Sequence, residues 1–205
     1  MNLEIQNRIV GVVGRKGAGK SFWLAEHLRY CPRLVVFDVL GEYNSIPNRI
    51  ESLKRFERFL KESRDKETFA CSYVPGGEPE QEIEDVSRLV YERGNLCLVC
   101  EEIALYTQPG SAPPLFGKLV RTGRHKRIDV CWATQRPAEC AKSITALTDL
   151  WVLFSLTEPR DLDAIGTRCG FEIARKVEEL RDHEHILWDV ASRQVIEDSP
   201  RLLKR

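Results

Sequence analysis

Short runs of mostly apolar residues, many of them β-branched, recur along the chain between Gly, Pro and charged residues. Runs of this length and composition predict strands buried in a sheet. Two more runs, on either side of Ala191-Ser192, predict a β-hairpin. We expect strands at residues 8–13, 34–37, 69–74, 96–100, 128–133 and 150–156, and the hairpin at residues 185–189 and 193–197.

Between the predicted strands, apolar residues recur at the three- and four-residue intervals of an amphipathic helix. Leu53, Phe56 and Leu60 are one such series. We expect helices at residues 21–30, 51–66, 78–93, 115–122, 161–165 and 171–181. Strands that alternate with helices predict an α/β fold with a mostly parallel sheet flanked by helices on both faces. We expect one domain over residues 1–205.

The composition is that of a folded globular protein. Of the 205 residues, 42% are hydrophobic and 30% are charged, whereas a disordered chain would be poorer in apolar residues. No apolar run approaches the roughly 18 residues of a membrane span. The first eight residues lack the apolar core of a secretion signal. We therefore expect a cytoplasmic protein without a membrane span, which for a viral protein means the host cytoplasm or the virion.

The charges balance overall but not locally. Lys and Arg number 31, as do Asp and Glu, which excludes a protein that coats nucleic acid by bulk positive charge. Residues 78–92 nevertheless hold six acids and one base, whereas residues 121–127 hold four cations and no acid. A local basic site therefore remains compatible with the neutral sum.

Seven cysteines, several of them in predicted core strands, are typical of reduced, buried thiols. Cys97 and Cys100 have the spacing of a zinc-binding pair. They lie in one apolar strand, where positions three apart point to opposite faces, and no second pair follows. The spacing therefore favours core residues over a metal site.

A glycine-rich segment follows the first predicted strand and precedes the first predicted helix. It matches the phosphate-loop pattern G-x-x-x-x-G-K-[ST] in full and in the required context. Glycines let the backbone direct its N–H groups at phosphates, the lysine reaches the β- and γ-phosphates, and the serine binds Mg²⁺. The motif comprises Gly14, Arg15, Lys16, Gly17, Ala18, Gly19, Lys20 and Ser21. It predicts binding of ATP with Mg²⁺.

Two glutamates follow the apolar strand at residues 96–100. The carboxyl ends of parallel strands face the ligand crevice of an open α/β sheet. We therefore expect Glu101 to hold the Mg²⁺ ion and Glu102 to deprotonate the attacking water. Aspartate is the usual residue at the metal position, so the division of roles between the two is open. The alternative is a strand that simply ends in two solvated acids.

Two further candidates flank the strand at residues 128–133. Gln135 follows it, and an amide there can donate to the γ-phosphate and accept from water; the alternative is a plain strand exit before Pro137. Ahead of the strand, the basic segment 121–127 contains Arg121 and Arg124. One interpretation is that one arginine serves a neighbouring subunit's nucleotide while the others contact a nucleic-acid backbone. The alternative is that the cations complement a helix dipole.

Together these segments resemble the FtsK–HerA superfamily of DNA-pumping ATPases. The resemblance rests on the phosphate loop, Glu101-Glu102, the Ala-Thr-Gln-Arg-Pro sequence at residues 133–137 with the Gly-Arg basic segment before it, and Asp-Val-Leu-Gly-Glu-Tyr at residues 38–43. The terminal hairpin is also similar. The resemblance spans residues 8–190, and it is most like the genome-packaging ATPases of tailless, membrane-containing viruses.

The resemblance implies a RecA-like core that forms a hexameric ring and threads double-stranded DNA through its pore, with capsid or portal-vertex proteins as further partners. It also implies that Gln135 senses the γ-phosphate and that Arg124, or else Arg121, acts in the neighbouring site. The function we expect is therefore an ATP-hydrolysing DNA translocase. The alternatives are a HerA-like ATPase that acts with a nuclease, a small P-loop phosphotransferase, and a nucleotide-gated binding module without hydrolysis.

Overall fold

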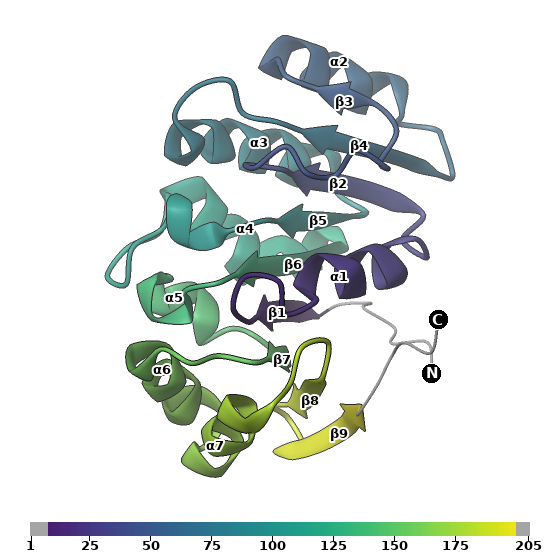
Figure 1. Ribbon diagram of the computed structural model, residues 1–205. Coiled ribbons are helices and arrows are strands. Elements are labelled where there is room, and N and C mark those ends of the chain that lie inside the picture. Colours follow the sequence, from purple (N-terminus) through teal and green to yellow (C-terminus); the bar gives the residue numbers. More distant parts are fainter. Residues whose placement is uncertain (1–7, 200–205) are drawn as a thin grey trace.

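The computed structural model describes residues 8–199, which form a single nine-stranded sheet (Figure 1). The strand order is β3-β4-β2-β5-β6-β1-β7-β8-β9. The first seven strands in this order run parallel, and β8 and β9 are antiparallel. The strands are β1 (Ile9–Val13), β2 (Arg33–Phe37), β3 (Arg49–Ile50), β4 (Phe69–Tyr73), β5 (Leu96–Cys100), β6 (Ile128–Thr134), β7 (Leu150–Phe154), β8 (His185–Asp189) and β9 (Gln194–Ser199).

Most of the helices connect parallel strands, as in other α/β folds, and the last two connect β7 to the antiparallel strand β8. The helices are α1 (Lys20–Leu28), α2 (Leu53–Glu62), α3 (Pro79–Arg93), α4 (Pro114–Thr122), α5 (Lys142–Thr145), α6 (Pro159–Cys169) and α7 (Phe171–Glu179), with short 3-10 turns η1 (Ile103–Leu105), η2 (Gly123–Lys126) and η3 (Pro137–Glu139). Within residues 8–199, no helix is long and apolar enough to cross a membrane.

The predicted strands, the hairpin and the mostly parallel sheet are confirmed, with boundaries that differ by one or two residues. Four details differ. The short helix α5 was not predicted, because its four residues carry no periodic pattern. The two-residue strand β3 is too short to leave an apolar pattern. The helix predicted at residues 51–66 ends at Glu62. The helix predicted at residues 161–165 is α6, which starts earlier because the Glu158 side chain caps it by accepting from the N–H groups of Arg160 and Asp161.

The two faces of the sheet are covered unequally. Side chains of α2, α3, α4, α5, α6 and α7 pack on one face, whereas α1 is the helix that packs on the other, together with Tyr43 and Ile46. Successive strand residues point to opposite faces. Accordingly, Cys97 lies in the core on the α1 side and Cys100 in the core on the opposite side.

The middle of the larger core depends on a glycine in β1. A Cβ atom at Gly11 would lie 2.4 Å from Cζ2 of Trp132, so only glycine leaves room for this indole against the strand. Trp132 stacks edge-on against Trp151 and donates its indole N–H to the hydroxyl of Thr148. The close packing ties β1 to β6 and β7, the strands on either side of it.

Candidate active site

Three strand ends bring the sequence-predicted residues to one edge of the sheet. β6 lies between β5 and β1, with Cys100 opposite Trp132 and Val13 opposite Thr134. The phosphate loop after β1, the glutamates after β5 and Gln135 after β6 therefore meet at the carboxyl edge. This is where ligands bind in open α/β sheets.

The phosphate loop is anchored at its start and open in its middle. Gly14 N–H donates to the carbonyl of Thr134 at 3.3 Å, and Arg15 N–H donates to that of Ser155 at 2.8 Å. The N–H groups of Lys16, Gly17 and Gly19 have no acceptor within residues 8–199. Gly17 and Gly19 have φ angles of 79° and 111°, a region that favours glycine. The loop thus presents free N–H groups at the start of α1, where an anion binds favourably.

Lys20 is held inside this loop. Its side chain is buried, and Nζ donates to the carbonyl oxygens of Gly14 at 2.8 Å and Arg15 at 3.2 Å. Burial lowers the pKa of Lys20, while the nearby charges of Glu102 and Glu101 oppose this shift. A cation fixed between backbone and carboxylates is placed to bind phosphate oxygens. Ser21, in the first turn of α1, is exposed to solvent.

Glu101 is buried beside Asp38, the residue that follows β2. It is 4% exposed, and its Oε2 atom is buried without a hydrogen-bond partner among the described residues. Burial, followed by the charge of Asp38 and a hydrogen bond with it, raises the pKa of Glu101 to about 8. Asp38 itself accepts from the N–H groups of Glu42 at 3.0 Å and Tyr43 at 3.1 Å and from the Ser72 hydroxyl at 3.0 Å.

The pairing of Glu101 with Asp38 suits a divalent cation. An unpaired carboxylate oxygen next to a second carboxylate is a costly arrangement unless a positive charge compensates it. Carboxylate oxygens are also the protein ligands that Mg²⁺ prefers. Glu101 therefore fits the metal-binding role expected from the sequence, with Asp38 as a neighbour that the expectation did not include.

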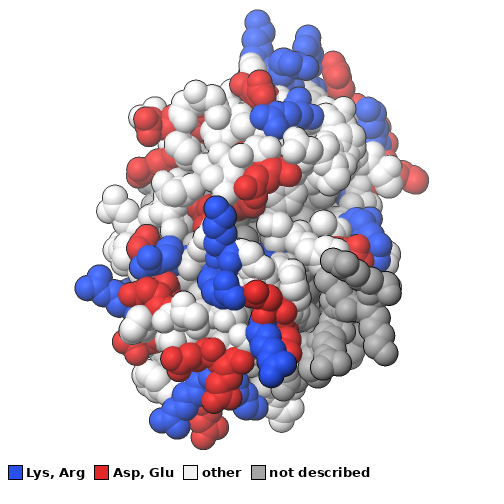
Figure 2. All heavy atoms as spheres, in the orientation of Figure 1, with Lys and Arg blue, Asp and Glu red and all other residues white. Residues whose placement is uncertain are grey.

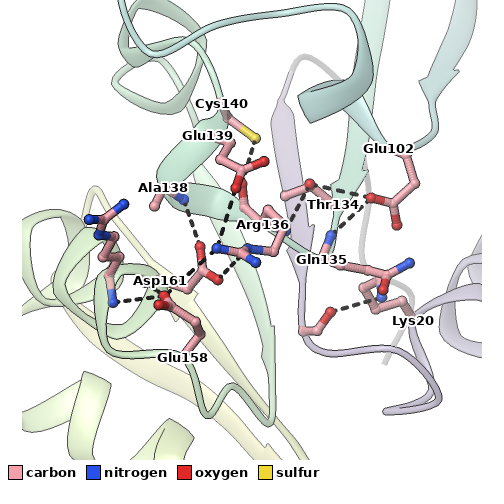
Figure 3. A network of polar contacts seen from close by, with 12 residues as sticks. Lys20, Glu102, Thr134, Gln135, Arg136, Ala138, Glu139, Cys140, Glu158 and Asp161 are labelled. Atoms are coloured by element: carbon pink, nitrogen blue, oxygen red, sulfur yellow. Dashed lines mark hydrogen bonds and ion pairs between the residues drawn. The ribbon is translucent and has the colours of Figure 1, made fainter.

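Glu102 faces the other way, toward β6. Its φ of 43° places the backbone in the left-handed region, an uncommon conformation for a residue other than glycine. Its Oε2 atom accepts from the N–H of Gln135 at 3.0 Å and from the hydroxyl of Thr134 at 3.4 Å (Figure 3). Glu102 is thus a positioned carboxylate, as a general base requires.

The loop after β6 is held by a second layer of polar contacts. Arg136 N–H donates to the Thr134 hydroxyl, and the Arg136 guanidinium pairs with Asp161 at 3.0 Å, with Glu139 at 3.3 Å and with Glu158 at 3.9 Å (Figure 3). Asp161 is 1% exposed. Figure 3 shows the Gln135 side chain extending from this loop toward Lys20. The start of α6 therefore fixes the loop that carries Gln135.

The segment between α7 and β8 lies against the phosphate loop. His183 N–H donates to the carbonyl of Ala18 at 3.0 Å, and Asp182 forms an ion pair with Arg15. The unit formed by α6 and α7 consequently contacts the site twice. Its first turn holds the loop after β6, and the segment after its last turn holds the phosphate loop.

Arg121 and Arg124 are not part of this chain's own site. They lie at the end of α4 and in η2, both exposed, just before β6 begins. Gln135 follows the end of the same seven-residue strand, and at about 3.3 Å per residue the two positions are about 20 Å apart. Their role in a neighbouring subunit's site stays a prediction.

The sequence interpretation missed the residues that support the site. Asp38 was noted only within the segment of residues 38–43, without a role. Asp161, Asp182 and His183 received none, because isolated acids in or beside helices are usually solvated. The available signal was weak: Asp161 sits in the first turn of a predicted helix, where a capping acid is common.

Comparison with known proteins supports the same fold. Protein P9 of Pseudoalteromonas phage PM2 is 32% identical over 139 residues, which are 65% of this chain and 62% of that protein, so the match spans less than two thirds of the relative. No protein-family model matches the chain.

Solved structures match over nearly the whole chain. The genome packaging NTPase B204 from Sulfolobus turreted icosahedral virus 2, in complex with ATP-gammaS, is 21% identical with a TM-score of 0.78, covering 96% of this chain and 98% of that one. VirB4 of Thermoanaerobacter pseudethanolicus is 12% identical with a TM-score of 0.59, covering 94% and 90%. The chain therefore has a P-loop ATPase fold like that of a viral packaging NTPase, as the resemblance in its sequence predicted.

Proposed function

We propose that this protein hydrolyses ATP and uses the reaction to move double-stranded DNA during viral genome packaging. The observation that carries the proposal is the meeting of Lys20, Glu102 and Gln135 at one edge of the sheet, beside a phosphate loop with free N–H groups. A small P-loop phosphotransferase does not need a glutamate positioned to activate water. The likeness to B204 from Sulfolobus Turreted Icosahedral Virus, which is described as a DNA-packaging ATPase, supports the choice of DNA.

The proposed reaction uses groups that already stand in place. The N–H groups of the phosphate loop and the ammonium of Lys20 bind the β- and γ-phosphates. The Glu102 carboxylate accepts the proton of the attacking water, and the Gln135 amide orients that water against the γ-phosphate. Ser21 and Glu101 would hold Mg²⁺, which neutralises charge on the phosphates. Most of the rate gain would come from positioning and charge.

We further propose that the active form is a ring, with a hexamer as the expected size, in which Arg124 or Arg121 of one subunit completes the site of the next. Their distance from their own phosphate loop supports this arrangement. Capsid or portal-vertex proteins are the further partners that packaging would require. The protein would act in the host cytoplasm or at the virion.

The test measures ATPase rate with and without duplex DNA over a range of protein concentrations. We expect stimulation by DNA and a specific activity that rises cooperatively with concentration, because a site shared between subunits exists only in the oligomer. Transfer of phosphate to a nucleoside or sugar instead of water would overturn the proposal. ATP binding without turnover, even with DNA present, would do the same.

A mixing experiment tests the shared site. Glu102→Gln and Arg124→Ala should each be inactive as pure oligomers. Mixed oligomers contain interfaces in which an intact Glu102 meets an intact Arg124, so mixing should restore part of the activity. The same mixture made with Arg121→Ala decides between the two arginines. No recovery in either mixture would refute the role of both.

A further inference from the structure

A cleft lined by arginines lies at the far end of the sheet, between β3 and α2. Its volume is about 150 Å³, with Ile50 and Phe59 as its apolar part and Arg49, Arg55 and Arg58 among its polar lining; Asn48 and Glu62 complete it. Figure 2 shows Lys and Arg side chains gathered at the top of the molecule, where Figure 1 places α2 and β3, whereas acids and bases alternate over the lower part of this face. Three of the seven lining residues are arginines and one is an acid, so the lining of the cleft is basic.

Arg55 and Arg58 present their guanidinium groups to a ligand, whereas Arg49 is already bonded to Glu51 and to the carbonyl of Gly41. Within residues 8–199, Arg55 makes no ion pair. Arg58 lies 4.0 Å from Glu62, but the two side chains are 69% and 67% exposed. Arg49 pairs with the exposed Glu51 at 2.9 Å. Exposed pairs of this kind contribute little stability and exchange readily with solvent or another anion.

We propose that this cleft binds phosphate groups of the DNA backbone. Guanidinium groups bind phosphate oxygens in pairs of parallel hydrogen bonds. Three of them around one small cleft match a polyanion without reading its sequence, as a motor that must move along any DNA requires. The inference rests on the proposed function, because it places the DNA of that function on a named surface.

The cleft is connected to the catalytic carboxylates through residues 38–43. Arg49 Nη1 donates to the carbonyl of Gly41 at 3.2 Å, and Gly41 N–H donates to the carbonyl of Asp38 at 3.3 Å. Asp38 lies beside Glu101. A second route runs through β4, where Ser72 pairs in register with Arg49 and its hydroxyl bonds to the Asp38 carboxylate.

These contacts assign a role to the segment of residues 38–43. It joins the cleft that would contact DNA to Asp38 and Glu101, the two carboxylates proposed to lie at the metal ion. DNA bound at the cleft would shift Arg49 and, through the hydrogen bonds of Gly41, would shift Asp38 as well. We expect this coupling to contribute to the stimulation of ATP hydrolysis by DNA.

The test compares two double variants with the same change in charge. Arg55→Glu/Arg58→Glu alters the cleft, whereas Lys54→Glu/Lys61→Glu alters the same helix outside it. Binding of a fluorescent 30-base-pair duplex is measured by anisotropy at several salt concentrations, with thermal unfolding as a check of folding. We expect the cleft variant to bind at least tenfold more weakly and to lose about two units of salt slope. We expect the helix variant to bind within threefold of wild type.

Each result bears on a distinct statement. Suppose that the wild type binds DNA. If both double variants lose affinity to the same extent, or if neither variant loses affinity, the inference about the cleft is wrong while the proposed function stands. If the wild type does not bind DNA but its cleft binds polyglutamate, the partner is an acidic protein, and both the inference and the DNA-translocating function are wrong. ATPase activity without DNA should be unchanged in both variants.

Arg49 tests the connection separately from binding. We expect Arg49→Ala to bind DNA only a few-fold more weakly but to lose most of the stimulation of ATPase rate at saturating DNA. Arg49→Lys, which keeps the charge but not the paired donors, should recover binding and little of the stimulation. Full stimulation of Arg49→Ala at saturating DNA would overturn the coupling through residues 38–43.

Discussion

Glu101 and Glu102 are neighbours in sequence, yet they lie in opposite surroundings. Glu101 lies beside Asp38, has a buried oxygen without a hydrogen-bond partner among residues 8–199, and has a pKa raised to about 8. Glu102 faces the end of β6 and accepts two hydrogen bonds there. The strand ends at Cys100 and Glu102 has a left-handed backbone, so the two side chains diverge. Two adjacent acids at a strand end thus take different roles from their neighbours: Glu101 lies beside a second carboxylate, and Glu102 is held by hydrogen-bond donors.

The largest effect should come from Lys20, which faces both glutamates. Lys20→Ala removes a fixed cation from the phosphate site, and loss of one such group costs a factor of about 10²–10³ in rate or more. The measurement is steady-state ATPase activity over a range of ATP concentrations, with Lys16→Ala, an exposed residue of the same loop, as the control. Unchanged turnover in Lys20→Ala would show that the active site is not at this loop, and the comparison of the two glutamates would then have no bearing on catalysis.

Glu102→Gln should come next. The amide retains the shape of the side chain but cannot take a proton, and a general base contributes a factor of about 10²–10⁴. We expect the variant to bind ATP with nearly unchanged affinity and not to cleave it. Calorimetry with ATP and a single-turnover assay measure the two steps. Normal turnover would mean that Glu102 is not the base.

Glu101→Gln should differ from Glu102→Gln in its response to Mg²⁺. If Glu101 holds the metal ion, the apparent affinity for Mg²⁺ should fall by about 10–100-fold, the range seen when support of a bound metal is lost. Activity should then recover at high Mg²⁺, whereas that of Glu102→Gln should not. Titration of both variants with Mg²⁺ at saturating ATP is the measurement. If high Mg²⁺ restores the activity of both variants, or of neither, the two glutamates do not have the separate roles of metal ligand and base.

The smallest effect should come from the contact between Arg136 and Asp161, which holds the loop after β6 next to Glu102. Asp161→Asn removes the charge that holds Arg136, and a disturbed buried hydrogen bond costs about 1–3 kcal/mol of stability. We expect a three- to tenfold lower kcat and little change in KM for ATP. Glu139→Gln is the matched control, because it removes an exposed partner of the same arginine and should cost under about 0.5 kcal/mol. Equal effects of the two changes would show that the buried contact has no special role.

Much of the site could be predicted because its parts are consecutive in sequence. The phosphate loop contains its glycines, lysine and serine within eight residues, and the strand that ends at Cys100 leads directly into both glutamates. The alternation of strands and helices also predicted that these strand ends face one edge. Strand β3 escaped prediction because two residues carry no periodic pattern, although they form one wall of the arginine-lined cleft.

Most strands and helices and the candidate groups follow from local sequence, because each depends on the side chains of one short segment. Which neighbour each group has depends on the tertiary structure. Strand order places β2 beside β5 and β6 on its other side, and this separates the surroundings of Glu101 from those of Glu102. The contact between Arg136 and Asp161 spans 25 positions, and that between Arg15 and Asp182 spans 167. Such contacts depend on the packing of the whole sheet and its helices, which no local pattern encodes.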